Sequence, residues 1–127
     1  MSSRAAQVSV PPHVQARRLF ASEKTSVWRA HLNTHLMHLN LDPPVLDLGS
    51  GAFGTTSYHY VIPGFREMEV HSVDISAERR PTKIADVERG IPYEDERFGS
   101  CLLFNVMMYF YQFASVVSEV RRVRRLT

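Results

Sequence analysis

A short apolar segment that runs directly into a glycine-rich turn constrains the fold of this chain more than any other feature. Residues Val45–Leu48 are apolar except for one acid, as in a buried β-strand, and Gly49, Gly51 and Gly54 follow at once. Glycines at this spacing let the backbone turn sharply and bring its amide N–H groups close to a ligand. The pattern therefore predicts a strand that ends in a ligand-binding loop.

Acidic residues stand where this strand and its neighbours should end. Asp47 precedes the first glycine by two residues, and an acid there suits a ligand with a positively charged end. The segment Val70–Asp74 is a second predicted strand, whose final acid lies roughly 20 residues after Gly54, a spacing that brings a carboxylate to ribose hydroxyls. Asp86 ends a third segment. Each acid alone could be a turn residue, but two acids after successive strands favour ligand binding.

The order of these segments resembles that of the class I methyltransferases that depend on S-adenosylmethionine (SAM). The similarity extends roughly from Pro44 to Arg125 and takes in the glycine loop and the segments Ile84–Val87, Ile91–Phe98 and Cys101–Val106. Alternation of strands and helices by itself suggests a doubly wound α/β fold. The resemblance implies a Rossmann-like three-layer sandwich, with a mostly parallel sheet of about four strands in the order 3-2-1-4 and helices on both faces.

By the same resemblance, one edge of the sheet would hold SAM, with S-adenosylhomocysteine as the product. Asp47 and the glycine loop would hold the methionine part, and Asp74 the ribose. Asp86 would accept a hydrogen bond from the adenine amino group, with the Val87 amide alongside, and Asn105 would line the floor near the sulfonium. The implied cofactor-binding residues are Asp47, Gly49, Ser50, Gly51, Gly54, Asp74, Ile75, Asp86, Val87 and Asn105. The implied activity is methyl transfer to an acceptor that no motif identifies.

Departures from the family pattern bear on catalysis and assembly. Phe98-Gly99 replaces a common Phe-Asp pair before the fourth strand, and Met107–Tyr109 replaces a segment that often carries an acid and an imidazole. No general base can therefore be named. Family members also continue into a fifth strand beyond the position of Arg125, so the chain is expected to hold the cofactor-binding half. The outer edge of the fourth strand would be unpaired and apolar, which favours a homodimer through that edge.

Apolar periodicity and turn residues place the remaining elements. The expected ranges are a helix at 22–39 with Ser22 as its N-cap, a short helix at 55–62, strands at 69–75 and 100–105, and a helix at 113–125. The first helix would bury a stripe made of Trp28, Leu32, Leu36 and Leu39. The last helix would bury Phe113, Val116 or Val117, Val120 and Val123.

Two charged clusters have plain structural interpretations. The spacing of His31, His35 and His38 can bind a metal, but no Cys, Asp or Glu pattern joins them, so a solvated helix flank is favoured. The carboxyl end of the last predicted helix carries four arginines: Arg121, Arg122, Arg124 and Arg125. Cations at this end complement the helix dipole, and we expect them to be solvated.

Length and composition limit the remaining possibilities. A chain of 127 residues forms one domain at most, and we expect a flexible N-terminus at 1–20 followed by a partial methyltransferase domain at 21–127. The net charge of +2 is too small to argue for nucleic acid, which favours a small-molecule acceptor. No apolar run approaches membrane-spanning length. Cys101, the single cysteine, should be buried and inert, and it fits a reducing compartment, so a cytoplasmic protein is expected.

Two further functions stay open. A non-catalytic SAM-binding protein, either a pseudoenzyme or a partner subunit, fits the absence of the later strands. An NAD(P)-linked oxidoreductase would share the glycine loop and Asp74. Asp47 counts against the oxidoreductase, as does the lack of a second nucleotide-binding half.

Overall fold

The computed structural model describes residues 26–49, 58–104 and 106–126 of the chain. These residues divide into two units. The first contains the described residues before Asn40 together with 58–63, and the second contains the remainder. The predicted flexible segment at 1–20 lies outside the described residues, so the expected division of the chain stays a prediction.

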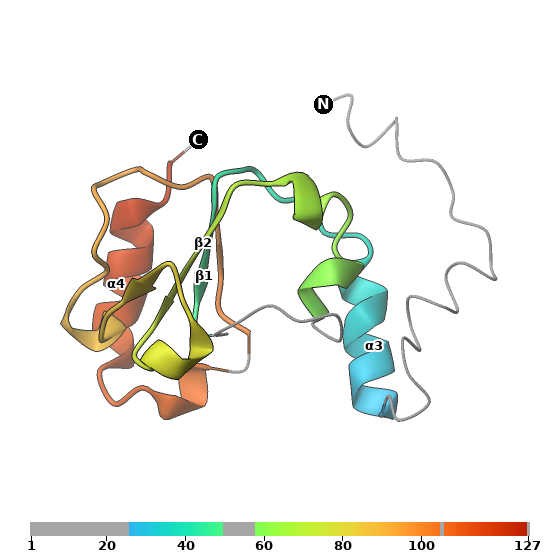
Figure 1. Cartoon of the computed structure of the whole chain (residues 1–127), viewed down its shortest axis with the longest axis horizontal. Coiled ribbons are helices and arrows are strands. Elements are labelled where there is room, and N and C mark those ends of the chain that lie inside the picture. The colour runs from blue at the N-terminus through green and yellow to red at the C-terminus, as the bar shows by residue number, and fades with distance from the viewer. Residues whose placement is uncertain (1–25, 50–57, 105, 127) are drawn as a thin grey trace. The chain divides into compact units, whose positions relative to one another are not determined.

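A four-stranded parallel sheet forms the centre of the second unit (Figure 1). The strands, in their spatial order, are β3 Lys83–Ile84, β2 Val70–Asp74, β1 Val45–Leu48 and β4 Ser100–Leu102. All neighbours run parallel, with Leu46 opposite His71 on one side and Cys101 on the other. The predicted α/β fold and its strand order 3-2-1-4 are thereby confirmed. The carboxyl ends of the strands consequently meet at one edge of the sheet.

Side chains reinforce the pairing of the shortest strand, β3. The Ser72 amide donates to the Thr82 hydroxyl oxygen at 2.9 Å, and the Thr82 amide donates to the Ser72 hydroxyl oxygen at 3.0 Å. Thr82 directly precedes β3, so these two hydrogen bonds extend the pairing of β3 with β2 by one residue toward the amino terminus. Asp86, expected to end this strand, instead follows it and caps the short 3-10 helix η4, Val87–Arg89.

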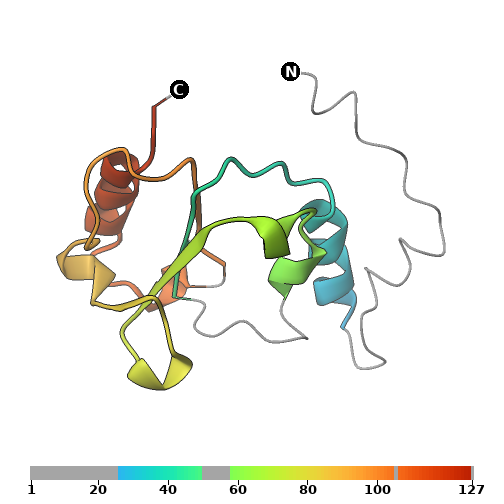
Figure 2. The ribbon, with the colours of Figure 1, turned by 45° about the horizontal axis from the view of Figure 1, so that its top comes forward.

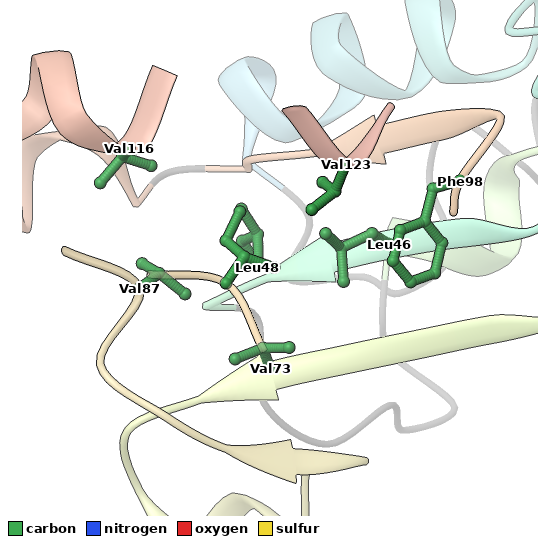
Figure 3. Packing of buried hydrophobic residues seen from close by; sticks show 8 residues of the cluster. Leu46, Leu48, Val73, Val87, Phe98, Val116 and Val123 are labelled. Carbon is green, nitrogen blue, oxygen red and sulfur yellow. The ribbon is translucent and has the colours of Figure 1, made fainter. Parts of the chain in front are cut away.

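One face of the sheet packs against helix α4, Phe113–Val123. Leu46, Leu48 and Val73 project from the strands, and Val116 and Val123 project from the helix (Figure 3). The full buried cluster is Leu46, Leu48, Val73, Val87, Ile91, Phe98, Val116 and Val123. Each such side chain contributes about 1.5–3 kcal/mol relative to an exposed one. The predicted helix stripe is correct at Val116, Val120 and Val123, whereas Phe113 is 53% exposed.

Arg122 fastens α4 to the loop before β4, which corrects the expectation that it is merely solvated. Its guanidinium donates to the carbonyl oxygens of Ile91 and Tyr93, both at 2.8 Å, and to the Glu119 carboxylate. Glu119 also accepts from the Ile91 amide at 2.8 Å. Hydrogen bonds from Arg122 and from this amide lower the pKa of Glu119. The last turns of α4 therefore hold the loop through a charged network.

The glycine before β4 has a steric reason. A Cβ at Gly99 would lie 2.3 Å from the Asp42 carbonyl oxygen and 2.7 Å from Nη2 of Arg125. Arg125 is itself held, because its guanidinium donates to the Pro43 carbonyl at 2.9 Å. Its amide donates to the Phe98 carbonyl at 2.7 Å, so the segment after α4 begins to pair beside β4. An aspartate at position 99 would not fit between these groups.

The first unit contains α3, Val27–Leu36, which packs against the 3-10 helix η1, Tyr58–Val61. Ser26 is the N-cap, accepting from the Arg29 amide at 3.1 Å, so the helix begins later than the Ser22 cap predicted. Within the predicted helix at 55–62, the described residues form η1, and residues 55–57 lie outside the described part. None of the helices described here is long and apolar enough to cross a membrane.

The buried face of α3 differs from the predicted stripe. Ala30, Asn33 and Leu36 are buried, whereas Trp28 is 68% exposed. Asn33 accepts from the Arg29 side chain at 3.0 Å, and this polar residue is completely buried in the middle of the face. Apolar periodicity does not predict a buried helix face that has a polar residue at its centre. The histidines at 31, 35 and 38 are exposed, as expected for a solvated flank.

Candidate functional site

The candidate residues gather at the edge of the sheet formed by the carboxyl ends of the strands. Ligands of parallel α/β sheets bind beyond this edge. In Figures 1 and 2 two short 3-10 helices lie there, η3 (Ala77–Arg79, yellow) after β2 and η5 (Met107–Tyr109, orange) after β4. Strands β1 and β2 and the turn after β3 each bring predicted site residues to this side.

Gly49 makes the turn that leaves β1. Its φ of 78° lies in the left-handed region that favours glycine, and its amide donates to the Val73 carbonyl at 2.8 Å. A Cβ at this position would stand 2.3 Å from Cγ2 of Val106. Conformation and space therefore both require glycine. Four other predicted residues lie outside the described part of the chain, so their roles stay predictions: Ser50, Gly51, Gly54 and Asn105.

Asp47 is completely buried within β1. Its register neighbours are Ser72 of β2 and Leu102 of β4. Because strand side chains alternate, Asp47 faces away from the core that Leu46 and Leu48 share with α4. A buried carboxylate must be held by hydrogen-bond donors or by a cation.

Asp74 ends β2 and is 8% exposed. Its Oδ1 accepts from the Ser76 amide at 2.9 Å, which is the role of a turn residue. Among the described residues, no hydrogen bond is made to its other carboxylate oxygen. The adjacent Ile75 is 70% exposed. A carboxylate with one oxygen available beside an exposed apolar side chain can accept hydroxyl hydrogens while the apolar group contacts a ring.

Asp86 caps the turn that follows β3. Its Oδ1 accepts from the Glu88 amide at 3.1 Å, and Oδ2 lies 3.8 Å from Nε of Arg89. Arg89 is highly exposed, so this ion pair adds little to stability. The neighbouring Val87 is buried in the core against which α4 packs, and it anchors the turn. The structure thus places Asp86 and Val87 at the expected edge, with a capping role for the acid.

Sequence reasoning missed the apolar surface of this edge. Ile84, Met108 and Tyr109 are 61%, 73% and 72% exposed. The sequence did not indicate that these residues are exposed, because large apolar residues are ordinarily assigned to a core. The exposure of Tyr109 shows that its ring is not part of the core.

Cys101 takes no part in this edge. It lies half-buried in β4, and burial raises the pKa of its thiol to about 11. The raised pKa keeps the thiol protonated near neutral pH, which agrees with the inert cysteine expected from the sequence, although the residue is only partly buried. In the described ranges, no three His, Cys, Asp or Glu side chains come together as a metal site.

Comparison of the chain with models of known protein families, with curated proteins and with solved structures gave no match. Function must therefore be inferred from the residues and their arrangement.

Proposed function

We propose that this protein binds SAM at the carboxyl edge of its sheet and transfers the methyl group to a small-molecule acceptor. One coincidence carries the proposal. Gly49 turns with a left-handed φ directly after β1, and Asp74 closes the adjoining strand β2 at the same edge. A parallel sheet in the order 3-2-1-4 places both beside the point where its connections diverge, which is where α/β sheets bind nucleotide-like ligands.

The described residues fit such a ligand by their chemistry. Asp74 would accept the ribose hydroxyls, and Ile75 would cover one face of a ring. Asp86, at the next turn, would meet the exocyclic amino group of the base. When bound, SAM would supply an electrophilic methyl carbon. A lone pair of the acceptor would form the new bond to that carbon as the C–S electron pair goes to sulfur, giving S-adenosylhomocysteine, and the acceptor's proton would pass to solvent. The contribution of the chain would be to position the two reactants and to exclude water.

The test is calorimetric titration of the full chain with S-adenosylhomocysteine and with SAM. Asp74→Asn should weaken binding by about 1.5–3 kcal/mol, which corresponds to about 10- to 150-fold. Asp42→Asn is the matched control, since Asp42 is an exposed acid on the amino-terminal side of β1. Its affinity should equal that of the wild type.

Three outcomes would contradict the proposal: a folded chain that binds neither ligand, equal losses in both variants, or tighter binding of NAD(P)H. If binding holds, turnover with acceptor mixtures separates an enzyme from a non-catalytic SAM-binding protein.

A further inference from the structure

We propose that an aromatic face beside this edge binds the methyl acceptor and selects an uncharged aromatic molecule. The aromatic face is defined by four residues: Met108, Tyr109, Tyr111 and Phe113. The inference rests on the proposed function, because it names the acceptor class for that transfer.

The first support is exposure. The exposed fractions of Met108, Tyr109, Tyr111 and Phe113 are 73%, 72%, 95% and 53%. Soluble proteins scatter exposed apolar side chains singly, and contiguous patches mark binding sites. Here four exposed large apolar side chains fall within six consecutive positions, which is a concentration and not a scatter.

The second support is the lack of charge. No Asp, Glu, Lys, Arg or His occurs from Phe98 to Ser118. Arg97 and Arg125 lie at the amino end of this segment, against Phe98 and Gly99. The part that carries the aromatic face is instead contacted by the carboxylate of Glu88, which accepts from the Gln112 amide. A phosphorylated or carboxylated acceptor would find no cation in this segment and would meet a carboxylate beside it. An uncharged ring would instead stack on the aromatic side chains, and the tyrosine hydroxyls would orient its polar groups.

The third support is location. Just before the aromatic face in the chain, Val106 packs against Gly49 at the turn after β1. Near the end of the face, the Gln112 amide donates a hydrogen bond to the carboxylate of Glu88, which lies in the turn that Asp86 caps. The aromatic face therefore spans the same edge as the proposed SAM site, and an acceptor seated on it would lie next to the methyl donor.

The size and charge of the face argue against larger occupants. At roughly 200 Å² for each side chain, the exposed area is on the order of 600 Å². A stable protein interface needs about 800 Å² from each partner, so a second copy of the chain would need more surface than this face offers. A membrane-surface site would carry lysines or arginines among its apolar residues, and this segment has none.

Two probes that share one naphthyl ring, one uncharged and one carrying a phosphate, test the proposal. The full chain, with and without saturating S-adenosylhomocysteine, is titrated calorimetrically with 1-naphthol and with 1-naphthyl phosphate. Naphthol should bind at least about tenfold more tightly than the phosphate. Tyr109→Ala and Phe113→Ala should each weaken naphthol binding about 3- to 10-fold, the scale of one aromatic contact. Trp28→Ala, which removes an exposed aromatic from α3, is the matched control and should change nothing.

The outcomes separate this inference from the proposed function. If S-adenosylhomocysteine binds but naphthol does not, or if the phosphate binds equally well, the acceptor class is wrong and the SAM site stands. If S-adenosylhomocysteine fails to bind, the proposed function is wrong. Titration with naphthol alone then shows whether the aromatic face binds aromatic molecules. If the variants abolish binding to phosphatidylcholine vesicles or self-association in sedimentation, the face serves a membrane or a second copy, and the acceptor assignment is overturned. Circular dichroism confirms that each variant is folded.

Discussion

Replacing Gly49 with alanine should destabilise the second unit measurably. The left-handed φ of 78° costs an L-residue about 1–2 kcal/mol. The new Cβ would also stand 2.3 Å from Cγ2 of Val106, and overpacking of this kind costs about 1–3 kcal/mol. A lower entropy of the unfolded chain offsets about 0.4–1 kcal/mol. The free energy of unfolding should therefore fall by about 1–4.5 kcal/mol.

Gly64 supplies the control for the backbone part of this cost. Its φ is 73°, but an added Cβ would meet only the end of the Met68 side chain at an ordinary 3.8 Å. Gly64→Ala should therefore cost only about 0–1.5 kcal/mol, because the same unfolded-state entropy offsets part of the backbone strain. Urea denaturation followed by circular dichroism measures both variants under the same conditions.

A double-mutant cycle isolates the steric part. Val106→Ala alone removes a buried side chain and should cost about 1–2 kcal/mol. In the double variant the new Cβ of residue 49 finds space, so the combined loss should be smaller than the sum by about 1–3 kcal/mol. Simple additivity, or a loss at Gly49 no larger than at Gly64, would refute the close packing of Val106 on this turn.

Further predictions concern the interior and the charged network. Gly99→Ala should destabilise the fold by about 1–3 kcal/mol, measured by urea denaturation, because its Cβ would collide with the Asp42 carbonyl. Arg122→Met should cost about 2–3 kcal/mol in the same assay, since two loop carbonyls lose their charged donor. The pKa of Glu119 is lowered on folding, so its contribution is present above the ordinary value of 4.5 and is lost as the pH falls through the lowered value. Acid titrations of unfolding free energy should therefore show a drop below about pH 4.5 that Glu119→Gln reduces. Alkylation of Cys101 should be slow at neutral pH and accelerate toward pH 10, because its pKa is about 11.

The parts of the fold that local sequence specifies were predictable. The three apolar residues of β1 and the glycine after it mark a buried strand and its turn. The second strand, Val70–Asp74, lies within the range 69–75 expected for it. The face of α4 was also readable, because Val116 and Val123 are seven positions apart, or about two helical turns.

Features that depend on tertiary contacts were not predictable. Asn33 is buried in α3 although it is polar, and the exposed Trp28 would have suited a core. Arg122 looked like any cation at a helix end, and only the fold brings the carbonyls of Ile91 and Tyr93 within its reach. At the candidate site, the position of Asp74 followed from the end of its strand, whereas Asp86 lies beyond the end of β3. The exposure of Tyr109 did not follow from the sequence, because no periodicity distinguishes a binding surface from a core.

The central claim is that the carboxyl edge of the sheet binds SAM, and amide shift mapping by nuclear magnetic resonance tests it most directly. Adding S-adenosylhomocysteine to the isotope-labelled chain should shift the amides of Gly49, Asp74, Ile75 and Val87 most. The amide of Arg122, which lies near the far end of α4, should stay in place and serves as the internal control. Saturable shifts confined to the edge are the result that the account predicts. A folded chain whose spectrum does not change, or changes chiefly around α4, would contradict it.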